Sequence, residues 1–125
     1  MFKFEKLKVW HQAREFVQHI YQLSNNFPKS EWYGLTSQIR RAAVSISLNI
    51  AEGSNSGSDK EFNRFLYMAS RSLDEVVSCL HLAQDMKFIN KGQFGRSYQL
   101  ADELGRRISS LKKFLSQSKN RAISQ

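Results

Sequence analysis

LTSQIRRAAVSISLNIAEG, residues 35–53, is the stretch that decides the fold of this chain. On a helix that turns by about 100° per residue, its apolar side chains fall into two stripes on nearly opposite sides. The first stripe consists of Leu35, Ile39, Ala42, Ala43, Ile46 and Ile50. The second consists of Val44, Leu48 and Ala51, and a polar stripe of Gln38, Arg41, Ser45, Asn49 and Glu52 runs between them. An ordinary surface helix has only one apolar stripe.

The second apolar stripe predicts a contact with another copy of the chain. In 125 residues, three other helices cannot easily surround a fourth on all sides. The alternative is a helix buried centrally in a single domain. The predicted subunit interface consists of the second stripe and its polar neighbours: Arg40, Arg41, Val44, Leu48, Asn49, Ala51 and Glu52. Arg40 suits a bidentate contact with a carboxylate across this interface, whereas a phosphate contact by the two arginines is the alternative.

Three further amphipathic segments complete the expected fold. The first runs from about Lys6 to Asn25, with Val9, Phe16 and Leu23 widening its apolar face on one flank. The next opens with a capping box of Ser58 and Glu61 and ends near Lys87. The last carries a heptad-like stripe as far as Leu115, and Asn90 and Gln93 offer it a second capping pair. Gly53 suits a left-handed C-cap of the helix quoted above. The pattern therefore predicts an all-α, up-down-up-down antiparallel four-helix bundle that assembles as a homo-oligomer.

Length and composition predict one bundle domain over residues 1–117 and a flexible basic tail over 118–125. No apolar run approaches the roughly 18 residues that a membrane span requires. Cys79 has no second cysteine with which to form a disulfide, so we expect it to be a small core residue. These features predict a cytoplasmic protein without a membrane partner.

The positive charge is concentrated in the last part of the chain. The net charge is +8, and residues 91–125 contribute eight basic and two acidic side chains to it. Such an excess favours phosphate-bearing partners through a sequence-independent field. The predicted nucleic-acid-binding residues are Arg96, Arg106, Arg107, Lys112, Lys113, Lys119 and Arg121. The alternative is a solvated helix face that keeps the bundle soluble.

Residues for catalysis do not converge in the sequence. His11 and His19 lie two turns apart without a ligand at the intervening turn, and His81 stands alone. Asp74 and Glu75 are adjacent, so their side chains point in different directions on a helix. We therefore expect no enzyme, no metal site and no cofactor, and the histidines are expected to be surface or helix-edge side chains.

The segments FEKLKVWHQA, YGLTSQIRRAAVSISLNIAEG and GSDKEFNRFLYMA resemble a bacterial family. These are the four-helix bundle proteins encoded in intervening sequences of 23S ribosomal RNA genes, and the likeness covers roughly residues 2 to 115. The chain departs from the family at Ser47 and Leu48, where proline and a small residue are common, and at Arg71, where glycine is common. The first departure bears on whether the helix bends there.

The resemblance implies a homo-oligomer, with a ring-like pentamer as the expected form. The chain is also distantly similar to the accessory variability protein of diversity-generating retroelements, which partners a reverse transcriptase and RNA. The function expected from residues and resemblance together is a non-enzymatic oligomer that binds RNA or a ribonucleoprotein through its basic surface. The alternative is a protein-interaction adaptor, such as a reverse-transcriptase accessory factor, that binds a nucleic-acid-handling protein and no RNA itself.

Overall fold

The computed structural model describes residues 1–124, with side chains described as far as Gln117. The described residues form four α-helices and no β-strand: α1 Lys8–Ser24, α2 Ser37–Ser54, α3 Asp59–Asp85 and α4 Lys91–Ser124. The prediction of an all-α chain with four helices is confirmed. The side chains of the predicted tail, 118–125, lie outside the described residues, and these include Lys119 and Arg121 of the predicted nucleic-acid-binding set.

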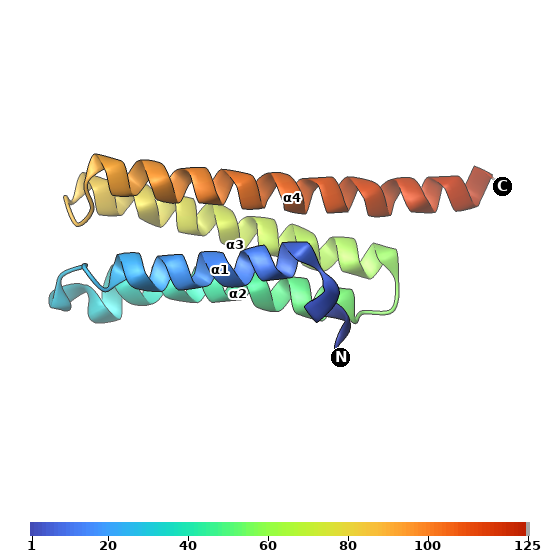
Figure 1. The fold of residues 1–125 in the computed structure, drawn as a ribbon, viewed down its shortest axis with the longest axis horizontal. Helices are drawn as coiled ribbons and strands as arrows, with labels where there is room; N and C mark the ends of the chain where they lie inside the picture. Colours follow the sequence, from blue (N-terminus) through green and yellow to red (C-terminus); the bar gives the residue numbers. More distant parts are fainter. Residues whose placement is uncertain (125) are drawn as a thin grey trace.

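The four helices lie lengthwise beside one another, and the chain turns back after each of the first three (Figure 1). Each helix packs against the next, and α1 also contacts α4, which closes the bundle. The α4 helix runs past the end of the other three (Figure 1). No helix within residues 1–124 is both long enough and apolar enough to cross a membrane.

The core is built from apolar side chains of all four helices. The buried side chains of α2 all belong to the first stripe, with Ile39, Ile46 and Ile50 fully enclosed. On α1 the buried face is rotated toward its predicted flank. Val9, Phe16 and Leu23 are buried, whereas Tyr21 is 40% exposed. The sequence repeat thus identifies which residues of α1 share a face, but packing against α2 and α4 decides which of them lies deepest.

The predicted capping pair at the start of α4 is reciprocal, whereas at the start of α3 only the Ser58 half of the predicted capping box forms and the Glu61 carboxylate pairs with Arg64. The backbone N–H of Glu61 donates to Ser58 Oγ over 3.1 Å at the start of α3. At the start of α4, Asn90 and Gln93 each accept the other's backbone N–H, at 2.8 and 2.9 Å. Lys87 takes a left-handed conformation with φ of 64° in the connection between these helices. Each cap therefore supplies an acceptor for a backbone N–H that the first turn of its own helix leaves without an intrahelical partner.

The prediction that Gly53 is a left-handed C-cap is wrong. Gly53 is a buried residue inside α2, and the positive φ belongs to Gly57 in the following loop. A Cβ atom on Gly53 would lie only 2.7 Å from Phe65 Cβ and 2.9 Å from Phe62 Cδ1. The glycine is therefore required because α2 and α3 approach closely at this point, not because the backbone turns.

A polar contact joins α1 to α4. His19 Nε2 lies 2.7 Å from Ser97 Oγ, and Ser97 is completely buried. Burial lowers the pKa of His19 from its ordinary value of 6.5, and the positive charge of Arg96 lowers this pKa further. The neutral imidazole is therefore the form that the folded bundle favours.

We predict that Gly53→Ala destabilises the bundle by about 1–3 kcal/mol, because the added methyl group overpacks the contact between α2 and α3. Gly95→Ala is the matched control, since a Cβ atom there meets no other atom within 4 Å. The control should be neutral or more stable by up to about 1 kcal/mol, because alanine restricts the unfolded chain. Urea denaturation followed by circular dichroism measures both changes. Equal stability of the two variants would contradict the packing role of Gly53.

We predict that the free energy of unfolding decreases as the pH falls below 6.5. The pKa of His19 is lower in the folded chain, so the unfolded chain takes up this proton first. The stabilisation is complete above pH 6.5 and is lost toward the lower folded pKa. His19→Gln should flatten this part of the profile. Denaturation midpoints measured between pH 8 and 5 test this, and parallel profiles for the two proteins would refute it.

Candidate assembly groove and nucleic-acid interface

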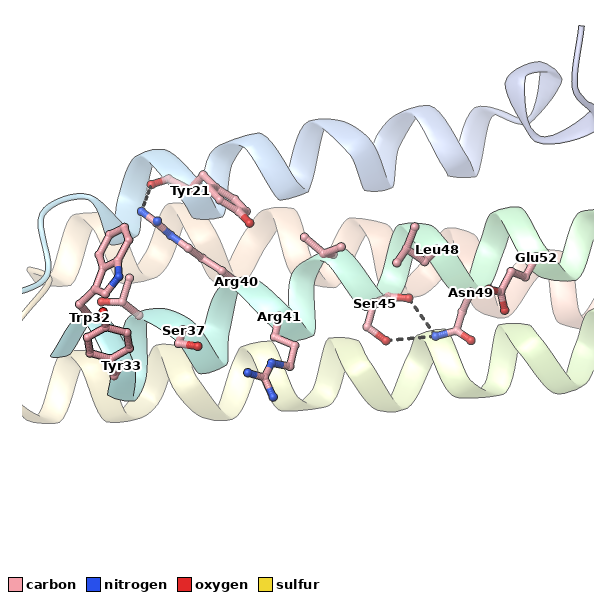
Figure 2. Close-up of a pocket in the computed structure, with 12 residues that line it drawn as sticks. Tyr21, Trp32, Tyr33, Ser37, Arg40, Arg41, Ser45, Leu48, Asn49 and Glu52 are labelled. Atoms are coloured by element: carbon pink, nitrogen blue, oxygen red, sulfur yellow. Dashed lines mark hydrogen bonds between the residues drawn. The ribbon is translucent and has the colours of Figure 1, made fainter.

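A groove of about 800 Å³ runs along the outer side of α2. Leu48 lines this groove with 57% of its surface exposed, and Val44 beside it is half-buried (Figure 2). Trp32 and Tyr33 close one end, with exposures of 52% and 93%. Ala51 is half-buried and lies in a smaller adjoining groove. The second apolar stripe therefore stays outside the core of the single chain.

The aromatic end of the groove depends on an irregular turn. Trp32–Thr36 forms one turn of π-helix ahead of α2, and Gly34 within it has non-helical dihedral angles. The Glu31 carboxylate accepts the backbone N–H of Leu35 over 3.0 Å and so caps the turn. Trp32 and Tyr33 are not among the residues that the sequence pattern predicts for this surface. The signal in the sequence was a pair of adjacent aromatic residues in the segment between the first two helices, where aromatic side chains are not expected to be buried in the core.

Arg40 is hydrogen-bonded to the C-terminal end of α1 in the same chain. Its guanidinium donates to Ser24 Oγ and Asn25 Oδ1, both at 2.8 Å, and to the Tyr21 carbonyl at 3.3 Å. The same group lies 4.6 Å from the ring centroid of Tyr21 and 5.2 Å from that of Trp32. The predicted carboxylate contact across an interface would therefore have to form in addition to these bonds. Within the chain, Arg40 orients the aromatic wall of the groove.

Some side chains of the polar stripe of α2 form hydrogen bonds within the bundle. Ser45 Oγ lies 2.9 Å from Ser72 Oγ of α3, and Asn49 donates to the Ser45 carbonyl at 2.9 Å. Arg41 and Glu52 are different. Both are exposed on the groove, and neither is paired with another side chain in the part of the chain whose side chains are described. Among the polar residues of the predicted interface, Arg40 and Asn49 are thus bonded within the chain, whereas Arg41 and Glu52 are opposite charges exposed on the groove.

The basic residues of α4 do not lie on one face. Arg96, Arg106 and Arg107 line a groove of about 920 Å³ between α1 and α4. Arg106 is paired with Asp102 over 3.0 Å. Lys112 lies on the side toward α3, with its Nζ 5.3 Å from the Tyr67 ring centroid. Lys113 is exposed. The five residues with described side chains therefore do not share one face of the helix, because Lys112 lies toward α3 and the three arginines toward α1.

The groove between α1 and α4 also contains acidic side chains. Glu15 and Glu103 line it beside Arg96 and Arg107. Opposite charges in one groove reduce the local potential, so this groove alone is a weak anion site. Binding to a polyanion would depend on the summed field of the whole basic surface.

The three histidines are separated in space. His11 Nε2 lies 2.6 Å from the Glu5 carbonyl, His19 contacts Ser97, and His81 packs on Phe94. Within residues 1–117, no three histidine, cysteine or acidic side chains are grouped so that they could hold a metal ion. Cys79 is buried as predicted, and burial raises the pKa of its thiol, with a smaller contribution from Glu75.

Comparison with known proteins places the fold. A crystal structure of a protein of unknown function from the S23 ribosomal protein family of Bacteroides thetaiotaomicron superposes with a TM-score of 0.78. The two sequences are 24% identical, and the match covers 84% of this chain and 98% of the other. No curated protein matches this sequence. The family model for 23S rRNA-intervening sequence proteins matches residues 5–110. The chain therefore belongs to the 23S rRNA-intervening sequence protein family.

Proposed function

We propose that this protein is a non-enzymatic, cytoplasmic module in which up-down-up-down four-helix bundles assemble into a homo-oligomer, with a pentamer as the expected form. The oligomer binds RNA or a ribonucleoprotein through the basic surface of α4. The observation that carries this proposal is the exposure of Leu48 at 57% in the middle of an apolar groove whose two flanking charges have no partner within the described side chains.

The groove supports assembly through both its shape and its chemistry. Tyrosine, tryptophan and arginine are enriched at protein interfaces, and burial of the exposed leucine would remove apolar surface from water. Arg41 and Glu52 stand about three helical turns apart along α2, so a neighbouring surface with the complementary order of charges would fix both position and direction. When a groove meets a different surface of the next copy, repetition of the contact closes a ring.

The basic surface supports binding of a phosphate backbone. Arg96, Arg107 and Lys113 are exposed on α4. In a ring each of them recurs once per subunit, so weak contacts on one chain add up to a higher overall affinity. The distribution of the basic residues over more than one face of α4 favours recognition of the RNA backbone over recognition of particular bases.

The aromatic end of the groove along α2 specifically favours the second candidate function, a protein-interaction adaptor that acts beside a reverse transcriptase or a similar enzyme. Tryptophan and tyrosine are enriched at protein interfaces, and Trp32 and Tyr33 close one end of the groove. Capture of a partner that survives nuclease treatment, together with no affinity for purified RNA, would support the adaptor instead of direct RNA binding.

We predict that Leu48→Glu reduces the oligomer to single chains and preserves helicity, because the charge enters the proposed interface and not the core. Multi-angle light scattering and circular dichroism measure the two properties. Leu82→Glu is the matched control, since Leu82 lies on α3 with a comparable exposure of 44%. An unchanged mass for Leu48→Glu, or equal dissociation in the control, would count against the groove as the interface.

We predict that RNA affinity falls steeply with salt and that Arg96→Gln and Arg107→Gln each weaken it. Each substitution should reduce the slope of log K against log salt by about one, as expected for the loss of one phosphate contact. Arg71→Gln provides the control, because Arg71 is an exposed arginine on α3 outside this surface. Fluorescence anisotropy at several salt concentrations gives the slopes. If the wild-type oligomer binds no RNA at low salt, direct RNA binding is excluded.

A further inference from the structure

We propose that the aromatic segment ahead of α1 is a stacking platform for the bases of single-stranded RNA. This platform consists of the 3-10 helix η1, Lys3–Lys6, with Phe2 before it and the first two turns of α1 after it. The proposal rests on the RNA-binding function above and adds a second, chemically different contact to the basic surface of α4.

Three aromatic rings in the platform form a column, in which Phe2 and Phe4 are stacked and the Phe4 ring is tilted by 55° to that of Trp10. The rings of Phe2 and Phe4 are stacked, with centroids 5.8 Å apart and planes 18° from parallel. The Phe4 ring packs in turn on Trp10 at 4.7 Å, and the Arg14 guanidinium lies 5.2 Å from the Trp10 ring centroid. Phe2 is 72% exposed at the outer end of the column. Since Phe4 covers one side of the Phe2 ring, the other side is open to a further planar group.

Basic side chains are interleaved with these rings. Lys3, Lys6, Lys8 and Arg14 are all exposed. Within residues 1–14 the only acidic side chain is that of Glu5, whose carboxylate accepts the backbone N–H of Phe2 over 3.0 Å. Glu52 of α2 is the neighbouring carboxylate at the base of the platform. The balance is therefore positive around an exposed ring, which is the combination that single-stranded nucleic acid requires.

The platform is held in place before any ligand arrives. His11 Nε2 donates to the Glu5 carbonyl over 2.6 Å, and the backbone N–H of Leu7 donates to the Phe4 carbonyl over 3.0 Å. Phe2 and Phe4 also line a small groove with Ala51 near the end of α2. A rigid aromatic surface loses little conformational entropy when a base stacks on it.

The position of the platform connects it with the basic surface of α4. Figure 1 shows η1 folded across the end of the bundle, and the later part of α4 runs past that same end. In this view η1 lies beside α2, on the opposite side of the bundle from α4, so a strand bound by its phosphates along α4 would pass around this end to place its bases on the platform. Single-stranded RNA fits this arrangement better than a duplex does, because only unpaired bases can present a free face to an aromatic ring.

The test compares Phe2→Leu with the wild-type oligomer. Leucine keeps an apolar side chain in the small groove but removes the aromatic face. We expect affinity for a labelled oligouridylate of about 20 nucleotides to fall about tenfold, and affinity for an RNA duplex of the same length to stay within about twofold. Tyr98→Leu is the matched control, since it removes a 47% exposed aromatic ring from the other end of the bundle. Fluorescence anisotropy at fixed salt measures the affinity of each of the three proteins for both RNAs.

The remaining outcomes separate this proposal from the function on which it rests. If wild-type protein binds neither RNA, the proposed function itself fails. If it binds RNA in a salt-dependent way that Arg107→Gln weakens and Phe2→Leu leaves unchanged, only the platform is refuted. A loss of oligomer mass in Phe2→Leu by light scattering would assign the ring to a subunit contact and overturn the proposal. Binding of Phe2-dependent strength to anionic phosphatidylserine vesicles, without oligouridylate binding, would do the same.

Discussion

The structure depends on a constraint imposed by α2, whose two apolar sides cannot both be buried in a bundle of four helices. The first side, with Ile46 at its centre, is enclosed completely, and the second, with Leu48 at its centre, is left in an open groove. Rotation of α2 about its own axis would not bring Leu48 into the core, because the close contact between Gly53 and Phe65 of α3 fixes the rotational position of the helix. Any gain from burying Leu48 must therefore come from another molecule.

The groove is shaped by contacts within the chain and not by a partner. Arg40 reaches from α2 to the end of α1 and stacks between Tyr21 and Trp32, while Glu31 caps the turn that precedes α2. A surface ordered in this way binds without first losing much side-chain freedom. The same contacts leave Arg41 as the exposed arginine of the pair, so the two neighbouring arginines have different roles although the sequence presents them together.

The positive charge of the chain is less concentrated in space than in sequence. Helical geometry sends Arg107 and Lys112, five residues apart, to opposite flanks of α4, and Asp102 neutralises part of the charge of Arg106. The aromatic and basic residues ahead of α1 form a second cationic region. It lies at the end of the bundle beyond which α4 extends. Recognition of a polyanion by this protein would thus combine several separated contacts, and an oligomer multiplies each of them.

The sequence by itself determined the four helices, the caps that begin α3 and α4, and the inward stripe of α2, because apolar periodicity and capping residues such as Ser58 are local properties of the chain. It also indicated which side of α2 stays outside the core, since the position of Leu48 opposite Ile46 follows from helical spacing. Only the tertiary structure decided the roles of Gly53, Arg40 and Trp32. Each of these depends on which residues of another segment come within a few ångströms, and distances between segments far apart in the chain are set by packing and not by any local pattern.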